Sequence, residues 1–374
     1  MKLLINNSST YKGGSEQVAL SFIYECRNYP EHEYHIVTGE NLSRQIEKEK
    51  FPENFTFYGL QKRPASSILT FFKTMFWLRK LEKRVQPDCV IATGGHGYSV
   101  TKAPLVAGFN IPHYLYPESP YFSQISFGKK LYWKIRKQIE FVFFRKVDTY
   151  LVQTDDVNER VRKLMKSNDV YTVSNTVNGH FFDYKEFPDK LPERSSGEVR
   201  LLTLSSYYPH KNLEVINSVL KRLLEFNHTN IRFVLTLPED IFKSKFDKII
   251  RDHIYNLGHI PIEECPSLYQ EIDFMFLPTL LECFSASYAE AMVMKKPILT
   301  SDLGFAHTVC KDAAVYFDPT DPEEIARKII GLIGDKAKQA ALVKKGIEIS
   351  SMFNTPEERA KKFLSICEII QSNE

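Results

Sequence analysis

Short apolar runs alternate with longer amphipathic stretches along most of this chain. The runs predict strands at 2–6, 34–38, 55–58, 88–92, 148–153, 200–204, 231–235, 274–278, 298–300 and 314–317. Apolar residues spaced by three and four predict helices at 67–84, 154–166 and 212–226. Further runs predict one or two strands within 103–107 and 112–116 and a helix over 246–255. Strands that alternate with helices favour an α/β fold of two doubly wound, Rossmann-like domains with parallel sheets, facing a cleft.

A change in composition marks the predicted boundary between these domains. Residues 185–197, KEFPDKLPERSSG, are rich in charge, proline and serine, which is typical of a linker. We therefore expect an N-terminal domain over 1–187, a linker over 188–198 and a C-terminal domain over 199–354. A last helix is expected over 355–374, because a threonine, a proline and a glutamate in its first turn resemble a capping sequence.

Composition excludes several classes of protein. The chain is 43% apolar and 25% charged, as in ordinary globular proteins, and it contains no run of about 18 apolar residues that would predict a transmembrane helix. The first residues predict a strand rather than a signal peptide. Six scattered cysteines without metal-ligand spacing favour reduced thiols in the cytoplasm. The net charge of +3 gives no argument for nucleic-acid binding.

Positive charge is nevertheless concentrated in two segments of the first half. Residues 62–84 and 129–146 each contain seven basic residues and one glutamate, interleaved with aliphatic and aromatic residues. Basic, aromatic-rich helices can lie on an anionic membrane surface. The alternative is a pair of sheet-packed helices with a solvated basic face, and the sequence leaves both interpretations open.

The richest candidate chemistry lies between Leu280 and Thr300. Glu282 and Glu290 are eight residues apart and flank a run of small residues, and predicted strands precede and follow them. This order predicts a β-α-β unit with polar groups at the carboxyl edge of the sheet, where open α/β sheets bind ligands. A helix N-terminus there can also hold phosphate through its free N–H groups. The alternative is two glutamates at a helix edge with no ligand.

Weaker candidates occur at other predicted strand ends. Lys211 follows the strand 200–204, and Gly13 and Gly14 follow the first strand. Glu118 lies in a proline-rich loop that could orient an acceptor, as could His96 or His113. Taken singly, each could equally be a surface lysine, a glycine-rich connection or a structural side chain.

Several of these segments together resemble one family. LSSYYPHKNL at 204–213, LGHI at 257–260, ECFSASYAEAM at 282–292 and PILTSDL at 297–303 are similar to the retaining nucleotide-sugar glycosyltransferases of family 4, in the GT-B superfamily. The resemblance implies that Lys211 binds the diphosphate of the donor, Glu290 its ribose and Glu282 its sugar. We expect Lys211, Glu282 and Glu118 to take part in catalysis, the first two from the resemblance and Glu118 from its position in the proline-rich loop. The implied donor site comprises Gly13, Gly14, Ser206, His210, Lys211, His259, Ile260, Glu282, Phe284, Ser285, Ala286, Ser287 and Glu290.

The family likeness also implies a fold and an activity. It implies GT-B architecture, with the C-terminal helix returning to the first domain. The implied reaction moves a sugar, with retention of configuration, from a nucleotide-diphosphate sugar to a hydroxyl of a glycan or lipid-linked oligosaccharide. It implies that the enzyme needs no metal or other cofactor and takes part in cell-surface polysaccharide synthesis. The expected location is the cytoplasm, or the inner face of the cell membrane if the two basic segments bind that membrane.

One position departs from the family pattern. The family usually has an arginine five or six residues before the lysine, as a second cation for the diphosphate, whereas this chain has Ser205, Ser206 and Tyr207 there. His210, Arg200 or a lysine of the first domain could take its place. The departure keeps two alternatives open, which are a nucleotide-sugar epimerase or hydrolase of the same fold and a non-catalytic partner subunit.

Overall fold

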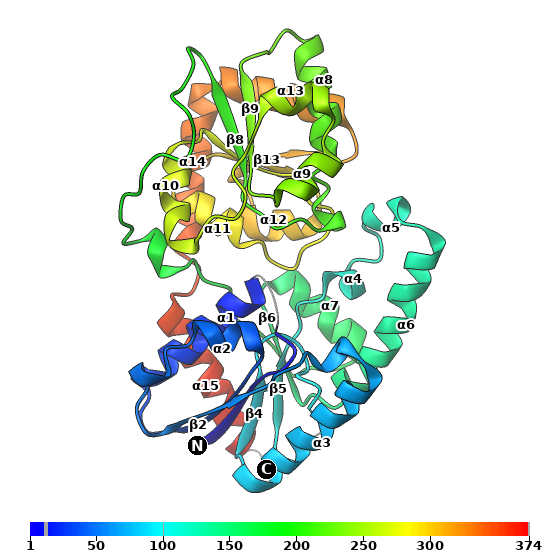
Figure 1. Cartoon of the computed structure of the whole chain (residues 1–374), viewed down its shortest axis with the longest axis vertical. Helices are drawn as coiled ribbons and strands as arrows, with labels where there is room; N and C mark the ends of the chain where they lie inside the picture. The colour runs from blue at the N-terminus through cyan, green and yellow to red at the C-terminus, as the bar shows by residue number, and fades with distance from the viewer. Residues whose placement is uncertain (11–13, 100, 373–374) are drawn as a thin grey trace. The chain divides into compact units, whose positions relative to one another are not determined.

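The structure, a computed structural model, describes residues 1–10, 14–99 and 101–372. It divides into two compact units (Figure 1). The first unit comprises Met1–Pro117, Ile125–Asn175 and Asn354–Glu374, and the second comprises Glu118–Gln124 and Thr176–Phe353. Apart from the short segment Glu118–Gln124, the chain therefore passes from the first unit to the second near residue 175 and back near residue 353.

The first unit is built on a parallel sheet of seven strands in the order β3-β2-β1-β4-β5-β6-β7. Its strands are β1 (Lys2–Asn7), β2 (Glu33–Thr38), β3 (Phe55–Gly59), β4 (Cys89–Ala92), β5 (Leu105–Gly108), β6 (Thr149–Val152) and β7 (Val170–Thr172). Its helices are α1 (Gly14–Glu25), α2 (Glu40–Gln45), α3 (Ile68–Val85), α4 (Pro112–Leu115), α6 (Phe127–Phe144), α7 (Asp155–Met165) and α15 (Pro356–Ser372).

The C-terminal helix α15 belongs to the core of this first unit, as the resemblance implied. Phe363 lies edge-on to Phe22 of α1, with the ring centroids 5.3 Å apart. The helix begins with the expected capping pair, because Glu358 N donates to Thr355 Oγ1 at 3.1 Å and Thr355 N donates to Glu358 Oε2 at 2.9 Å. These two bonds satisfy backbone N–H groups that have no partner inside the helix.

The second unit contains a parallel sheet of six strands in the order β10-β9-β8-β11-β12-β13. Its strands are β8 (Val199–Thr203), β9 (Ile231–Leu235), β10 (Ile254–Asn256), β11 (Phe274–Leu277), β12 (Ile298–Ser301) and β13 (Ala314–Phe317). Its helices are α5 (Tyr121–Gln124), α8 (Val215–Glu225), α9 (Glu239–Lys245), α10 (Cys265–Gln270), α11 (Ala286–Val293), α12 (Gly304–Cys310), α13 (Pro322–Gly334) and α14 (Lys336–Ser350). In Figure 1, α8 and α13 cover one face of the sheet and α11 and α14 the other.

Two predicted elements differ from the structure. Residues 112–116, expected as a strand, form the short helix α4, in which Pro112 occupies a first-turn position that suits its fixed φ. Residues 246–255, expected as a helix, form a 3-10 segment (Lys248–His253) that leads into β10. Ile249 fitted the apolar spacing of a buried helix face, yet 84% of its surface is exposed, so the pattern there does not mark a buried face.

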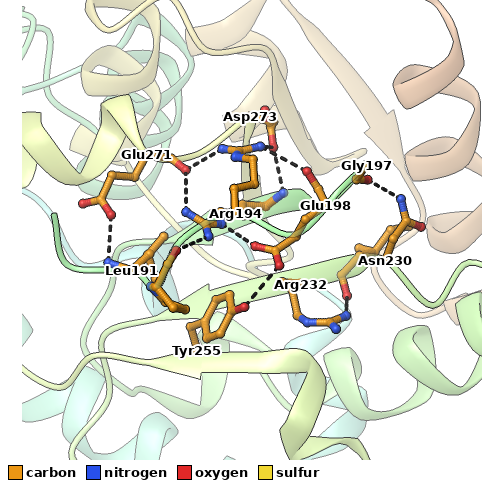
Figure 2. Close-up of polar contacts among 12 residues, drawn as sticks. Leu191, Arg194, Gly197, Glu198, Asn230, Arg232, Tyr255, Glu271 and Asp273 are labelled. Atoms are coloured by element: carbon orange, nitrogen blue, oxygen red, sulfur yellow. Dashed lines mark hydrogen bonds and ion pairs between the residues drawn. The ribbon is translucent and has the colours of Figure 1, made fainter.

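The expected linker, residues 188–198, lies inside the second unit and is held to it by a polar network (Figure 2). Glu271 accepts from Lys190 N and Leu191 N at 2.9 and 2.8 Å. Arg194 Nη1 donates to Asp273 Oδ2 at 2.6 Å. Charge, proline and serine made this segment look like a flexible connection, but here those charges pair with groups at the amino ends of the strands.

The centre of this network is a buried ion pair. Arg200 Nε lies 2.6 Å from Glu198 Oε1, and the two side chains are only 4% and 2% exposed. The guanidinium also donates to Pro192 O at 2.6 Å, and Tyr255 Oη donates to Glu198 Oε2 at 3.2 Å. Burial alone would raise the pKa of Glu198, but its hydrogen bond to Arg200 and the charge of Arg200 hold that pKa below its ordinary value. Loss of either partner would leave a buried charge uncompensated.

Replacing Arg200 by methionine should destabilise the second unit by about 3 kcal/mol, because it leaves the Glu198 carboxylate buried without its cation. Urea-induced unfolding measures this change. Arg222→Met is the matched control, since that side chain is 48% exposed and pairs with Glu225 at the surface, where such a pair contributes less than about 1 kcal/mol. The double variant with Glu198→Leu should recover most of the loss. Equal losses for Arg200→Met and Arg222→Met would contradict the role given to the buried pair.

Candidate functional site

The candidate site lies at the carboxyl edge of the second sheet, where the strand order changes direction. β8 lies beside β9 on one side and β11 on the other, so the connections after β8 and β11 diverge from adjacent strands. Open α/β sheets bind ligands at such a switch point. Lys211 follows β8 and Glu282 follows β11, and this places both predicted residues at that edge.

Backbone hydrogen bonds join the two loops that carry these residues. Lys211 ends a 3-10 turn, Pro209–Lys211, and the carbonyl of its neighbour His210 accepts from Leu280 N at 2.7 Å and from Thr279 Oγ1 at 3.1 Å. Asn212 then adopts a left-handed conformation, φ 56°, and its side chain donates to Pro319 O at 2.9 Å. The loop after β8 is therefore fixed at two points, and both lie next to Lys211.

Lys211 and Glu282 form an ion pair with each other. Their side chains are 13% and 14% exposed, so most of each charge is removed from water. An ammonium group has three donors, which allows Lys211 to hold Glu282 and an oxygen of a ligand together. The pair therefore places a cation and a carboxylate side by side at the carboxyl edge of the sheet.

The run of small residues leads into helix α11. Ser285 is the N-cap residue, and its side chain makes no capping hydrogen bond. The Ser285 hydroxyl therefore leaves the N–H groups of the first turn to other acceptors. Ser287 Oγ instead donates to Leu204 O at 3.2 Å, which ties the helix start to the end of β8. Ala286 begins the helix, and Phe284 lies edge-on to Phe353 with centroids 5.7 Å apart. The N–H groups and the dipole of this turn are suited to an anion.

Glu290 lies deeper in the same helix. It is 7% exposed, and Tyr269 Oη donates to its Oε2 at 3.2 Å. Burial raises the pKa of Glu290 to about 7, although the hydrogen bond from Tyr269 acts in the opposite direction. A carboxyl group that titrates near neutrality inside a candidate site is typical of functional positions.

The remaining donor-site candidates of this unit are more exposed. Ser206 is exposed in the loop after β8, and the ring of His210 stacks on Tyr208 at 5.5 Å. His259 and Ile260 follow β10 and Gly258, whose positive φ of 72° turns the chain there. These two residues therefore lie at the same edge of the sheet as Lys211 but beyond β9.

The predicted residues of the first half are placed differently. Glu118 is exposed and belongs to the second unit, where its neighbour Ser119 donates through Oγ to Leu280 O at 2.7 Å, in the loop that carries Glu282. Gly14 begins α1 in the first unit, and Gly13 lies outside the described residues.

Two histidines suggested for acceptor binding lie against aromatic rings in the first unit. His96 is 4% exposed and stacks on Phe143 at 4.9 Å, and burial lowers its pKa to about 3. His113 stacks on Trp133 at 3.8 Å, and burial lowers its pKa to about 4. Both environments favour the structural interpretation.

Arg200 cannot supply the second cation, which the family pattern includes and this chain lacks at the corresponding position. It lies at the amino end of β8, opposite the candidate site, and its guanidinium is bound to Glu198 and Pro192. The suggestion made from sequence is therefore wrong for this residue. His210 remains the candidate in the loop that carries Lys211.

No pattern in the sequence indicated a role for Tyr269 or Thr279. Tyr269 lies in α10, far from Glu290 along the chain, and tyrosine at an apolar helical position looks like any core residue. Thr279 is fully buried, and its hydroxyl bonds to the carbonyl of His210. Only the packing of α10 and of the loop after β11 reveals these contacts. The described residues contain no group of three or more His, Cys, Asp or Glu side chains placed to hold a metal ion.

Sequence comparison finds relatives that match part of the chain. Residues 185–349 match the family model of glycosyl transferases group 1. The O-antigen chain mannosyltransferase RfbU of Salmonella typhimurium is 22% identical over 208 residues, covering 54% of this chain and 55% of the relative. An O-antigen chain mannosyltransferase of Escherichia coli is 26% identical over 160 residues, covering 41% and 42%. The chain thus spans about half the length of the curated relatives it matches.

Solved structures match the whole chain at low identity. Sucrose-phosphate synthase of Thermosynechococcus elongatus has a TM-score of 0.77 at 13% identity, covering 100% of this chain and 99% of its own. WaaG, a glycosyltransferase involved in lipopolysaccharide biosynthesis, has a TM-score of 0.71 at 14% identity, covering 99% of each chain. HepE of Anabaena, solved with UDP and glucose, has a TM-score of 0.72 at 15% identity, covering 99% and 100%. The architecture is that of the GT-B glycosyltransferases.

Proposed function

We propose that this protein is a glycosyltransferase that moves a sugar from a nucleotide-diphosphate sugar to a hydroxyl of a glycan or lipid-linked oligosaccharide. The observation that carries the proposal is the pairing of Lys211 with Glu282 across adjacent strand ends, within the segment that matches group 1 glycosyl transferases. The names of the O-antigen mannosyltransferases and the complex of HepE with UDP and glucose support a nucleotide-sugar donor and a polysaccharide product.

Each residue of the site has a part in the proposed reaction. Lys211 and the N–H groups at the start of α11 stabilise the negative charge of the diphosphate as it leaves. Glu290 accepts hydrogen bonds from the ribose hydroxyls, and Glu282 accepts from hydroxyls of the transferred sugar. Glu118, in the segment next to the loop of Glu282, orients the acceptor. Ser206, His259 and Ile260 line the nucleotide.

The proposed chemistry retains the anomeric configuration, as in glycosyltransferase family 4. The bond between the anomeric carbon and the phosphate oxygen breaks while the acceptor hydroxyl attacks the same face. The departing phosphate oxygen takes the proton of that hydroxyl, and a nucleoside diphosphate is released. This route needs no protein nucleophile and no metal ion, because the cationic and N–H groups supply the charge stabilisation.

Thermal unfolding in the presence of UDP, GDP, ADP and their sugars tests the donor assignment. A ligand at 100 times its dissociation constant should stabilise the protein by about 2.7 kcal/mol, which separates a true donor from the others. The selected donor is then incubated with candidate glycan acceptors, and nucleotide release is measured with and without them. Transfer requires release that depends on the acceptor.

Three outcomes would contradict the proposal. No stabilisation by any nucleotide would remove the donor site. Nucleotide release or sugar interconversion without an acceptor would favour the hydrolase or epimerase of the same fold. Tight binding without turnover for every donor and acceptor would favour a non-catalytic subunit, the alternative raised by the absent arginine.

A further inference from the structure

Two helices of the first unit leave large apolar side chains in water. On α3, four such residues are between 62% and 79% exposed, and on α6 six are between 45% and 80% exposed. They are Ile68, Leu69, Phe72 and Phe76 on α3, and Phe127, Leu131, Tyr132, Ile135, Ile139 and Val142 on α6. We call these ten residues the apolar ridge. Large apolar side chains gathered on the surface of two helices in this way point to an interaction site.

The ridge on α6 is separate from the face that packs into the unit. Phe141, Phe143 and Phe144 are buried, and they fix the helix to the core. Phe127, Leu131, Ile135 and Ile139 are spaced by four, so they lie in one row along the helix and point away from that core. An 18-residue helix is about 27 Å long, so the row extends across much of one side of the unit.

Along α3 one face changes from apolar to basic. Residues spaced by four are Ile68, Phe72 and Phe76, followed by Lys80 and Arg84, and all five are exposed. The first half of the row suits a hydrocarbon environment and the second half suits anionic groups beside it. The N-terminal turns of α3 contact the end of α6, because the rings of Phe71 and Phe143 lie 5.7 Å apart. Figure 1 shows both helices on the same side of the first unit.

Charge identifies the kind of surface that this ridge fits. Each helix carries five basic residues and one glutamate, whereas the whole chain has a net charge of only +3. An apolar row bordered by Lys and Arg matches an anionic lipid surface, with acyl chains facing the row and headgroups facing the cations. Among the described residues, no helix has the length and the apolar content needed to cross a bilayer.

We propose that α3 and α6 insert the apolar ridge into the interface of an anionic membrane, with the helices lying along its surface. The inference goes beyond sugar transfer and does not depend on the donor site. It also differs from attraction by basic charge alone, because the exposed row consists of isoleucine, leucine and phenylalanine. Salt screens the attraction of Lys80 and Arg84 to lipid headgroups, but it does not screen apolar insertion.

Flotation with phosphatidylcholine vesicles, with and without phosphatidylglycerol, tests this proposal on the full chain. The native protein should float with the anionic vesicles and keep most of its binding in about 0.5 M NaCl. The double variant Phe72→Ser and Phe76→Ser should bind about a hundredfold more weakly, at about tenfold per apolar side chain. Lys80→Glu with Arg84→Glu should weaken the preference for phosphatidylglycerol, while binding through the apolar side chains remains.

Ile249→Ser is the matched control, since this residue is 84% exposed in the second unit and should not affect flotation. Circular dichroism establishes that each variant is folded, and thermal shifts with the nucleotide panel report separately on the donor site. Equal flotation of the serine double variant and the native protein would overturn the proposal. Complete loss of native binding in about 0.5 M NaCl would show that electrostatic attraction alone holds the protein on the vesicles, and this would contradict insertion of the apolar ridge. A native dimer that the serine substitutions dissociate would make the ridge a protein interface instead.

Discussion

Replacing Lys211 by methionine should lower the rate of sugar transfer by about a thousandfold. The ammonium is the cation that the structure places at the carboxyl edge beside Glu282, and loss of a group that stabilises developing negative charge typically costs two to three orders of magnitude. The arginine that family 4 enzymes usually have before this lysine is absent here, and Arg200 cannot replace it because it is bound at the opposite end of β8. The transfer rate should therefore depend more strongly on Lys211. Initial rates of nucleotide release with saturating acceptor measure the effect.

Lys221→Met provides the control for removal of a lysine from this unit. Lys221 pairs with Asp247 at 2.6 Å, but its side chain is 53% exposed, so neither activity nor stability should change appreciably. Because Lys211 holds Glu282 in place, the double variant Lys211→Met with Glu282→Gln should be little worse than the single variant. If Lys211→Met kept more than a tenth of the native rate, another cation, with His210 the first candidate, would have to bind the diphosphate.

Replacing Glu290 by glutamine should lower transfer by about a hundredfold and yet stabilise the ligand-free protein at pH 8. The amide has one acceptor oxygen in place of a charged pair, so the hydrogen bonds to the ribose hydroxyls weaken. In the native protein, burial raises the pKa of Glu290 from 4.5 to about 7. The folded chain therefore binds this proton more tightly than the unfolded chain does.

The sign of the pH dependence follows from that difference. Stability from the protonated carboxyl is fully present below about pH 4.5 and is lost as the pH rises through about 7. Glutamine does not titrate, so the variant should exceed the native protein by about 3 kcal/mol at pH 8 and match it near pH 4.5. Urea unfolding at the two pH values measures this, with Glu193→Gln, an exposed glutamate, as the control.

The same group should make donor binding depend on pH. Hydroxyl groups donate to the ionised carboxylate, so the KM for the donor should fall as the pH rises through about 7. Tyr269→Phe removes the hydroxyl that donates to Glu290 and should move this transition to higher pH. A donor KM that is independent of pH between 6 and 8 would show that Glu290 does not bind the donor as a carboxylate.

Local sequence patterns predicted the fold and much of the candidate site for a physical reason. Strands and helices alternate through most of both halves, and parallel strands bring their carboxyl ends to one edge. Residues that follow β8 and β11, such as Lys211 and Glu282, therefore lie at the same edge of the sheet. The capping pair at Thr355 and Glu358 was equally local, since its partners lie within one helical turn.

Such local patterns could not predict contacts between segments that are distant in the sequence. The Tyr269 hydroxyl meets Glu290 only because α10 packs beside α11, and nothing in the spacing of either helix records this. The segment 188–198 had the composition of a linker, but its backbone and charges are bound by Glu271 and Asp273. Composition reports how polar a segment is and does not report whether partners exist for its polar groups.

The return of α15 to the first unit has a consequence for synthesis on the ribosome. Residues 176–353 of the second unit form one continuous segment, whereas the core of the first unit includes Phe363 and Leu364 from the last helix. The first sheet is translated early, but the apolar surface that α15 covers stays open until almost the whole chain has emerged. The second unit can therefore complete its core first, and a nascent chain arrested before residue 356 would expose the side of the first unit that binds α15.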